Sequence, residues 1–218
     1  MTGNEFASEM EEKVAALLEA ARPLSEAWAN KVWPRQQLIE VLKHYAYAEW
    51  RSCLHNAKHF LNTPMQQWDL KLGLAEQCHE EASHYEIERR KLLELGVDFD
   101  PAAYTPVPSW KRYFDNQENA PTALEKIAAE NYGGEPKAVL FFKLAANGAD
   151  PHLRDIAAPQ IEDEEEHHEF GRAILEKYAT TPEVQQRLRD ISALQQKLSV
   201  DAMRELNERL GLPAPRTS

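Results

Sequence analysis

The sequence feature that most constrains the fold is a run of six acidic residues and two histidines, Glu162-Asp163-Glu164-Glu165-Glu166-His167-His168-Glu169. It lies within a helical pattern that extends from about residue 151 to residue 178. Carboxylates and imidazoles three or four residues apart share one face of a helix, and a helix needs that arrangement to hold a transition metal. A solvated acidic face is the alternative, and the rest of the chain has to decide between the two.

The composition predicts an all-α protein. Only 8 of the 218 residues are glycine, and no stretch alternates apolar and polar residues as a strand does. We expect one helical domain over residues 1–218, with a frayed tail after about residue 211. The net charge of -11 disfavours nucleic acid and membranes as partners. Cys53 and Cys78 form no CxxC motif; they are typical of reduced thiols and favour a cytoplasmic protein.

Prolines, glycines and capping residues divide the chain into seven expected helical segments. These run from about residue 4 to 30, 35 to 61, 64 to 95, 110 to 116, 121 to 147, 151 to 178 and 182 to 210. We expect Pro23 to kink or restart the first segment. We also expect Thr63 to cap the third segment, with Pro64 at its first helical position. Gly133-Gly134 and Pro136 should bend or open the fifth segment.

Four of these segments offer carboxylates and histidines at the spacing of metal ligands. Glu81 and His84 share a face of the third segment, and Glu164 shares a face with both His167 and His168. Two further segments carry a glutamate among apolar neighbours, where a carboxylate must be exposed, paired or metal-bound. Those two glutamates are Glu49 and Glu130. A lone Glu from each of two helices, with Glu-x-x-His from two others, is the ligand set of di-iron carboxylate bundles.

The distances of these residues from the predicted turns support a common site. Glu130 lies 17 residues before the end of the fifth segment, and His168 lies 17 residues after the start of the sixth. In an antiparallel hairpin both would sit roughly 25 Å from the turn, at ~1.5 Å per residue. Glu49 and Glu81 lie at similar numbers of residues from the turn between the second and third segments. The four positions are therefore predicted to lie at similar levels of the bundle.

Short motifs along the chain resemble the TenA (thiaminase II) and PqqC families. Arg22-Pro23-Leu24 followed by Trp33-Pro34-Arg35-Gln36 resembles the opening of those families, and Leu92-Leu93-Glu94-Leu95-Gly96 resembles the end of their third helix. Asn131-Tyr132-Gly133-Gly134 resembles the glycine-kinked helix of heme oxygenase. The resemblance covers most of the chain and implies a seven-helix heme-oxygenase-like bundle. A ferritin-like four-helix bundle is the alternative.

Within that superfamily, the residues fit the di-iron oxidases and oxygenases. Thiaminase II has a nucleophilic cysteine in the fifth helix where this chain has Ala129, and heme oxygenase has a proximal histidine in the first helix, whereas this chain has none before His44. The resemblance to the di-iron branch implies these metal ligands: Glu49, Glu81, His84, Glu130, Glu164 and His168, with His167 and Glu165 as substitutes. It implies two iron ions as the cofactor, with manganese or no metal as alternatives.

The function implied by this resemblance is that of an O2-activating di-iron oxidase or oxygenase acting on a small organic metabolite. We expect His44, Tyr45 and Tyr132 to line the substrate pocket, and the fold implies a homodimer. Two other functions stay open. One is a metal-free TenA- or PqqC-like enzyme acting on a small heterocycle, and the other is a non-catalytic helical interaction protein whose acidic run is solvated.

Overall fold

The computed structural model describes residues 1–212, and every regular element in that range is a helix. The α-helices are α1 (Gly3–Ala29), α2 (Arg35–Asn62), α3 (Trp68–Glu94), α4 (Pro108–Glu118), α5 (Ala123–Asn131), α6 (Glu135–Ala145), α7 (Pro151–Ala157), α8 (Ile161–Tyr178) and α9 (Pro182–Arg209). Short 3-10 helices, η1 (Met65–Gln67) and η2 (Ala158–Gln160), precede α3 and α8. The all-α prediction is confirmed. The tail expected to fray lies almost wholly outside the described residues.

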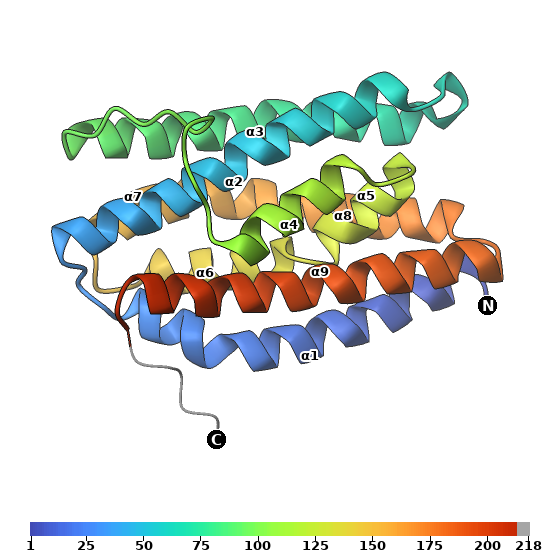
Figure 1. Cartoon of the computed structure of the whole chain (residues 1–218). Helices are drawn as coiled ribbons and strands as arrows, with labels where there is room; N and C mark the ends of the chain where they lie inside the picture. Colours follow the sequence, from blue (N-terminus) through green and yellow to red (C-terminus); the bar gives the residue numbers. More distant parts are fainter. Residues whose placement is uncertain (213–218) are drawn as a thin grey trace.

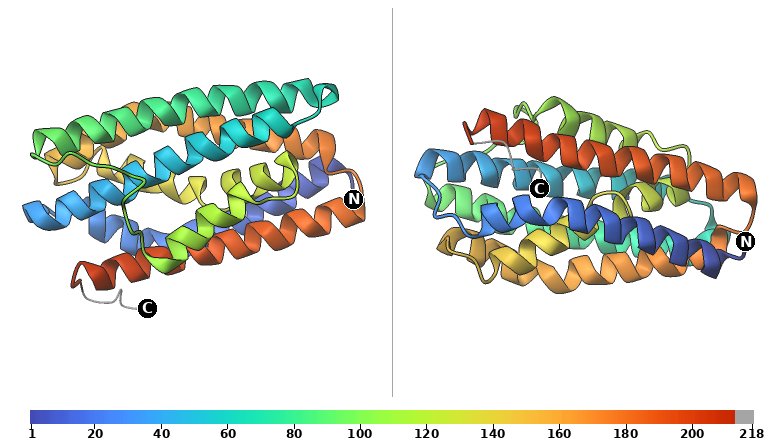
Figure 2. Two further views of the ribbon diagram at one scale, coloured as in Figure 1. Left: turned by 45° about the horizontal axis from the view of Figure 1, so that its top comes forward. Right: turned by 90° about the horizontal axis from the view of Figure 1, so that it is seen from below.

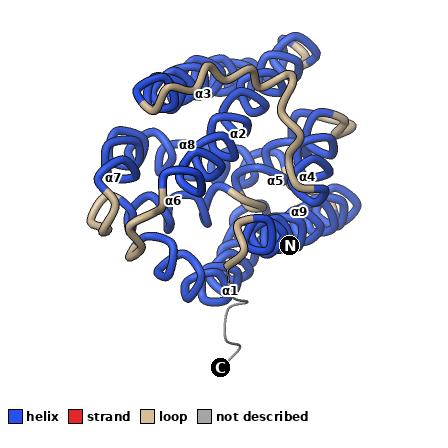
Figure 3. Tube along the Cα trace, turned by 60° about the vertical axis from the view of Figure 1, so that its left-hand side comes forward, coloured by secondary structure: helices blue, strands red, loops and turns tan. Residues whose placement is uncertain are grey.

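The long helices lie side by side along one axis of the molecule. α2 and α3 form an antiparallel hairpin along one side, and α1 and α9 run along the opposite side (Figure 1). α8 packs against α1, α5 and α6, and α4 packs against α2 and α9. The rotated views show the same grouping of helices around a shared axis (Figures 2 and 3). In the described range, no helix is both long enough and apolar enough to span a bilayer.

α1 continues through Pro23 without a restart, because the proline is on an exposed face where water can solvate the carbonyl that loses its partner. Two other expectations about helix boundaries were wrong. Thr63 does not cap α3: its hydroxyl donates to the carbonyl of His59 at 2.7 Å, and the chain passes through η1 first. The segment expected from residue 151 to 178 is also divided, because η2 separates α7 from α8.

The predicted opening of the fifth segment is confirmed. Helix α5 ends at Asn131 and α6 begins at Glu135, with Gly133 and Gly134 between them. A Cβ at Gly133 would lie 2.6 Å from the Cβ of Gln195, and one at Gly134 would collide with the ring and hydroxyl of Tyr113. Only glycine allows the backbone to pass this close to α4 and α9. The interruption brings carboxylates from both short helices, α5 and α6, toward the interior.

Two apolar clusters pack the bundle. One includes Trp28, Trp110 and Phe141, and the other includes Phe6 and Leu74. Burying each of these large side chains contributes roughly 1.5–3 kcal/mol. That stabilisation offsets the cost of the charged groups that the same helices bury.

Candidate metal centre

Seven ionisable side chains gather in the interior of the bundle, and each is at most 7% exposed. They are Glu49 from α2, Glu81 and His84 from α3, Glu130 from α5, Glu135 from α6, and Glu164 and His167 from α8. Charged groups removed from water to this extent are costly unless they are paired, protonated or bound to a metal. The arrangement of their donor atoms decides which of these applies.

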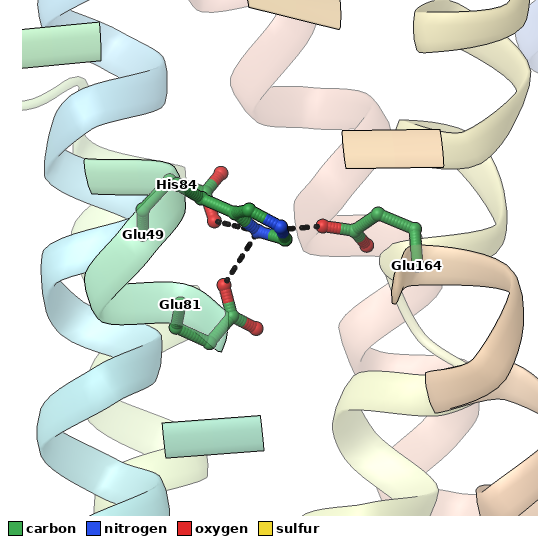
Figure 4. A group of neighbouring side chains, drawn as sticks. All are labelled: Glu49, Glu81, His84 and Glu164. Carbon is green, nitrogen blue, oxygen red and sulfur yellow. Dashed lines mark ion pairs between the residues drawn. The ribbon is translucent and has the colours of Figure 1, made fainter. Parts of the chain in front are cut away.

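The first group consists of Glu49, Glu81, His84 and Glu164, whose potential ligand atoms all lie within 4.8 Å of one another. Nδ1 of His84 lies 3.7 Å from both Glu49 Oε2 and Glu81 Oε2, and 3.6 Å from Glu164 Oε1 (Figure 4). These separations are too long for hydrogen bonds. They are close to the roughly 3.0–3.5 Å between neighbouring donors on one cation with bonds of about 2.1 Å.

The second group consists of Glu81, Glu135 and His167. Nδ1 of His167 lies 3.4 Å from Glu135 Oε1 and 3.8 Å from Glu81 Oε1. Glu81 therefore belongs to both groups, and it turns one oxygen toward each histidine: Oε2 toward His84 and Oε1 toward His167. A carboxylate in this position can bridge two cations.

Each histidine is held by an acidic residue of the opposite helix, His84 of α3 by an acid of α8 and His167 of α8 by an acid of α3. Nε2 of His84 lies 3.0 Å from Asp163 Oδ2, and Nε2 of His167 lies 2.8 Å from Glu80 Oε2. A neutral ring that donates its Nε2 proton to the acid keeps the Nδ1 lone pair free for a metal. This carboxylate–histidine contact is the usual support of a metal-ligating imidazole.

Several polar atoms at the centre have no hydrogen-bond partner. These are Glu81 Oε2, His84 Nδ1, Glu130 Oε1, Glu135 Oε1 and His167 Nδ1. Each buried unsatisfied group costs about 1–3 kcal/mol. Five such atoms in one centre therefore indicate a binding site whose ligand would satisfy them. Carboxylate oxygens combined with imidazole nitrogens suit iron and manganese. The residues present therefore fit a dinuclear transition-metal site.

Without a metal, the centre binds protons. Burial, reinforced by the charge of Glu49, raises the pKa of Glu81 to about 7. Burial and the nearby Glu81 raise the pKa of Glu164 well above its usual value. Burial opposes a charge on His84, but the neighbouring carboxylates Glu49 and Glu81 raise its pKa to about 12. Protons thus occupy the donor atoms that a cation would otherwise bind.

Glu130 is paired with a buried lysine. Its carboxylate forms an ion pair with Lys126, whose ammonium also donates to Asn56. Burial raises the pKa of Glu130 to about 8, Lys126 opposes that shift, and the charge of Glu135 adds to it. When ionised, the five glutamates carry five negative charges, Lys126 offsets one of them, and two divalent cations would balance the remaining four. A sixth carboxyl, Glu88, is fully buried beside them, and burial raises its pKa well above its usual value.

The structure brings together four of the six predicted ligands in one group and places a fifth, Glu130, beside them. His168 is not among them: its ring lies 3.0 Å from both Glu11 Oε2 and the carbonyl of Asn131. Its neighbour His167, predicted as a substitute, occupies the centre instead. Glu165 lies at the surface, where it pairs with Lys143.

The physical reason lies in η2. A 3-10 turn rises about 2.0 Å per residue, so counting α-helical residues from Pro151 gave the wrong level for His168. One residue also turns an α-helix by about 100°. His167 and His168 therefore point in different directions.

Sequence reasoning missed Glu135, Glu80 and Asp163. A signal for the two outer acids is present in the sequence, because the pattern acid-Glu-x-x-His occurs twice, as Glu80–His84 and as Asp163–His167. No such signal identifies Glu135, because the path of the chain through the glycine pair decides which carboxylates point inward.

A small cavity opens beside the centre, with a free volume of about 60 Å³. Its walls include the cluster glutamates together with His44, Tyr45, Trp110 and Lys137. His44 stacks on Trp110 with ring centroids 4.5 Å apart. Two of the three predicted pocket residues, His44 and Tyr45, therefore lie there. The third, Tyr132, packs in an apolar cluster beside His168 and is not part of this wall.

No protein-family model matches the chain, and no curated protein matches its sequence. The functional assignment therefore rests on the geometry of the centre and of its cavity.

Proposed function

We propose that this protein is a di-iron enzyme that uses O2 to oxidise a small organic metabolite. The observation that carries the proposal is the position of Glu81 between His84 and His167, with one oxygen toward each ring. A single-metal site has no need of a carboxylate shared by two ligand groups. A solvated acidic face would not bury these residues.

The order of the candidate ligands along the chain supports the same proposal. α2 and α6 each offer a single glutamate to a group, whereas α3 and α8 each offer Glu-x-x-His. This ligand set is the one of ferritin-like di-iron bundles, and the heme-oxygenase-like di-iron branch that the sequence resembles shares it. It therefore supports a di-iron centre and leaves both descriptions of the fold open.

Each residue of the centre has a distinct role in this proposal. Glu49, Glu81, His84 and Glu164 would hold one iron, and Glu81, Glu135 and His167 the other. The bound irons would supply the binding and reduction of O2. Asp163 and Glu80 orient the imidazoles, and Lys126 offsets the charge of Glu130. The aromatic walls of the cavity would exclude bulk water from the substrate.

The cavity favours an enzyme over a protein that only stores or carries metal. It adjoins the cluster glutamates and is otherwise lined largely by aromatic side chains, as is typical of a site for a small organic molecule. The metal-free alternative accounts less well for the five unpaired donor atoms, since an organic substrate would not satisfy all of them.

The test is the iron content of the full-length protein after anaerobic reconstitution and removal of loosely bound metal. We expect two irons per chain in the wild type and less than one in Glu81→Ala, because that substitution removes a ligand from both groups. His168→Ala is the matched control and should keep two, since its ring contacts Glu11 and a backbone carbonyl. A wild type with less than one iron per chain, unaffected by Glu81→Ala, would refute the proposal. Manganese measured in the same samples identifies the alternative metal.

A further inference from the structure

The cavity beside the metal centre has two chemically different ends. Its walls include Glu49 and Glu81, which lie together in the cluster, and Lys137 and His44, which both lie beside the Trp110 ring. His44 and Glu49 are five residues apart on α2, which separates the two ends by about 7.5 Å along that helix. A molecule in the cavity would therefore meet metal at one end and an amine at the other.

Lys137 is a buried amine without a counter-ion, and burial lowers its pKa to about 7. Its side chain is 7% exposed, and its ammonium donates to the carbonyl of Ser199 at 3.2 Å and lies 5.4 Å from the centre of the Trp110 ring. No carboxylate of the described residues comes within ion-pair distance of it. An ammonium has three protons to donate, and a buried charge without a partner is costly.

A second polar group at the same end is unsatisfied. His44 is 3% exposed, and its Nδ1 has no hydrogen-bond partner. Its stacking on Trp110 fixes the plane of the ring. The ammonium of Lys137 and this imidazole nitrogen both belong to the wall of the cavity, so one bound group can satisfy both.

We propose that the cavity binds a small monocarboxylate, with its carboxylate on Lys137 and His44 and its carbon chain directed toward the metal centre. This inference rests on the proposed function for the identity of the site. One lysine offsets one negative charge, which matches a carboxylate better than a dianion such as phosphate. The Lys137 ammonium and the unpaired Nδ1 of His44 lie beside the Trp110 ring, and they set the orientation of the bound carboxylate. A free volume of about 60 Å³ limits the ligand to a few carbon atoms.

Butyrate and its uncharged analogue butyramide are the probes. Their binding to the full-length protein is measured by calorimetry, before and after loading with iron under anaerobic conditions. We expect butyrate to bind at least tenfold more tightly than butyramide, and Lys137→Met to remove that preference while its iron content stays at the wild-type level. Lys143→Met is the matched control, because Lys143 is on the same helix with its side chain 50% exposed and paired with Glu165. It should bind butyrate as the wild type does.

Equal binding of butyrate and butyramide to the wild type would overturn the inference without any variant. So would a preference for butyrate that persists in Lys137→Met, because the carboxylate would then bind elsewhere, for instance on the metal. The iron measurement separates this inference from the proposed function. A Lys137-dependent preference in a protein that holds no iron supports the carboxylate site and refutes the di-iron enzyme. Two irons per chain without the preference support the di-iron centre and refute the carboxylate site.

Discussion

Helices α3 and α8 carry the same pattern, an acid followed by Glu-x-x-His. The two groups of candidate ligands around their histidines, called half-sites below, are nevertheless unequal. His84 on α3 faces three glutamates, from α2, α3 and α8. His167 on α8 faces two, Glu81 and Glu135. α2, opposite α3, is continuous, whereas the chain is interrupted between α5 and α6. Similar motifs thus give one half-site with four protein ligands and one with three, and the second leaves more positions open for exogenous ligands.

The largest effect that tests this inequality is the loss of metal from each half-site. In His167→Ala the group around His84 stays complete, so we expect about one iron per chain to remain. In His84→Ala only the three-ligand group stays intact, so we expect its iron to be held more weakly and the competing chelator to leave less iron per chain than in His167→Ala. The measurement is iron per chain after gel filtration with a competing chelator. Equal losses in the two variants would show that the half-sites are equivalent and that the comparison is wrong.

The pH dependence of stability tests whether the metal-free half-sites hold protons. The pKa of Glu81 is raised to about 7 and that of Glu130 to about 8, from a usual value of 4.5. Between pH 4.5 and 8 these two carboxyl groups therefore bind more protons in the folded chain than in the unfolded chain. Their contribution to the free energy of unfolding is fully present below that window and is lost as the pH rises through it. His84, with its pKa raised to about 12, acts in the same direction above pH 6.5. Burial lowers the pKa of His44 and His55, which act in the opposite direction below pH 6.5.

We expect the melting temperature of the metal-free protein to fall by about 5 °C or more between pH 5 and pH 8. Iron displaces these protons, so the iron-loaded protein should not lose stability over that range. Thermal unfolding followed by circular dichroism, with chelator and with iron, gives both curves. Glu81→Gln should flatten the metal-free curve, because it removes the proton site shared by the two groups. A metal-free melting temperature that rises with pH would contradict the assignment.

Much of this centre follows from sequence because helix periodicity is a local property. The spacing of Glu81 and His84 places both on one face of α3 whatever the rest of the chain does. Glu49 is recognisable because Ala46, Tyr47 and Ala48 beside it are apolar and buried. For such residues the local pattern and the tertiary packing agree.

The remaining features depend on interruptions whose geometry no local pattern specifies. The 3-10 turn Ala158–Gln160 shifts the level of α8, so His167 lies in the centre where His168 was expected. The glycine pair between α5 and α6 lets Glu135 approach the cluster while Glu130 pairs with Lys126. Both outcomes depend on how the backbone crosses a break, and packing against other helices decides that.

The smallest expected effect concerns the two acids that hold the histidines, each of which lies on the helix opposite its histidine. Asp163 is on α8 but holds His84 of α3, and Glu80 is on α3 but holds His167 of α8. Removing the charge of such a supporting acid costs about 10- to 100-fold in metal affinity. Both acids are partly exposed, with side chains 36% and 27% accessible, so we expect the lower end of that range.

The decisive readout is which iron each variant weakens. Asp163→Asn should lower the affinity of the four-ligand half-site, although Asp163 is not on the helix of the histidine it supports. Glu80→Gln should lower the affinity of the three-ligand half-site in the same crossed manner. Stepwise iron titrations followed by Mössbauer spectroscopy distinguish the two sites, and Glu166→Gln, a change elsewhere in the acidic run, serves as the control. If each variant instead weakened the half-site of its own helix, the acids would act through helix position, and the pairing of each acid with the opposite histidine would have no role in holding the metal.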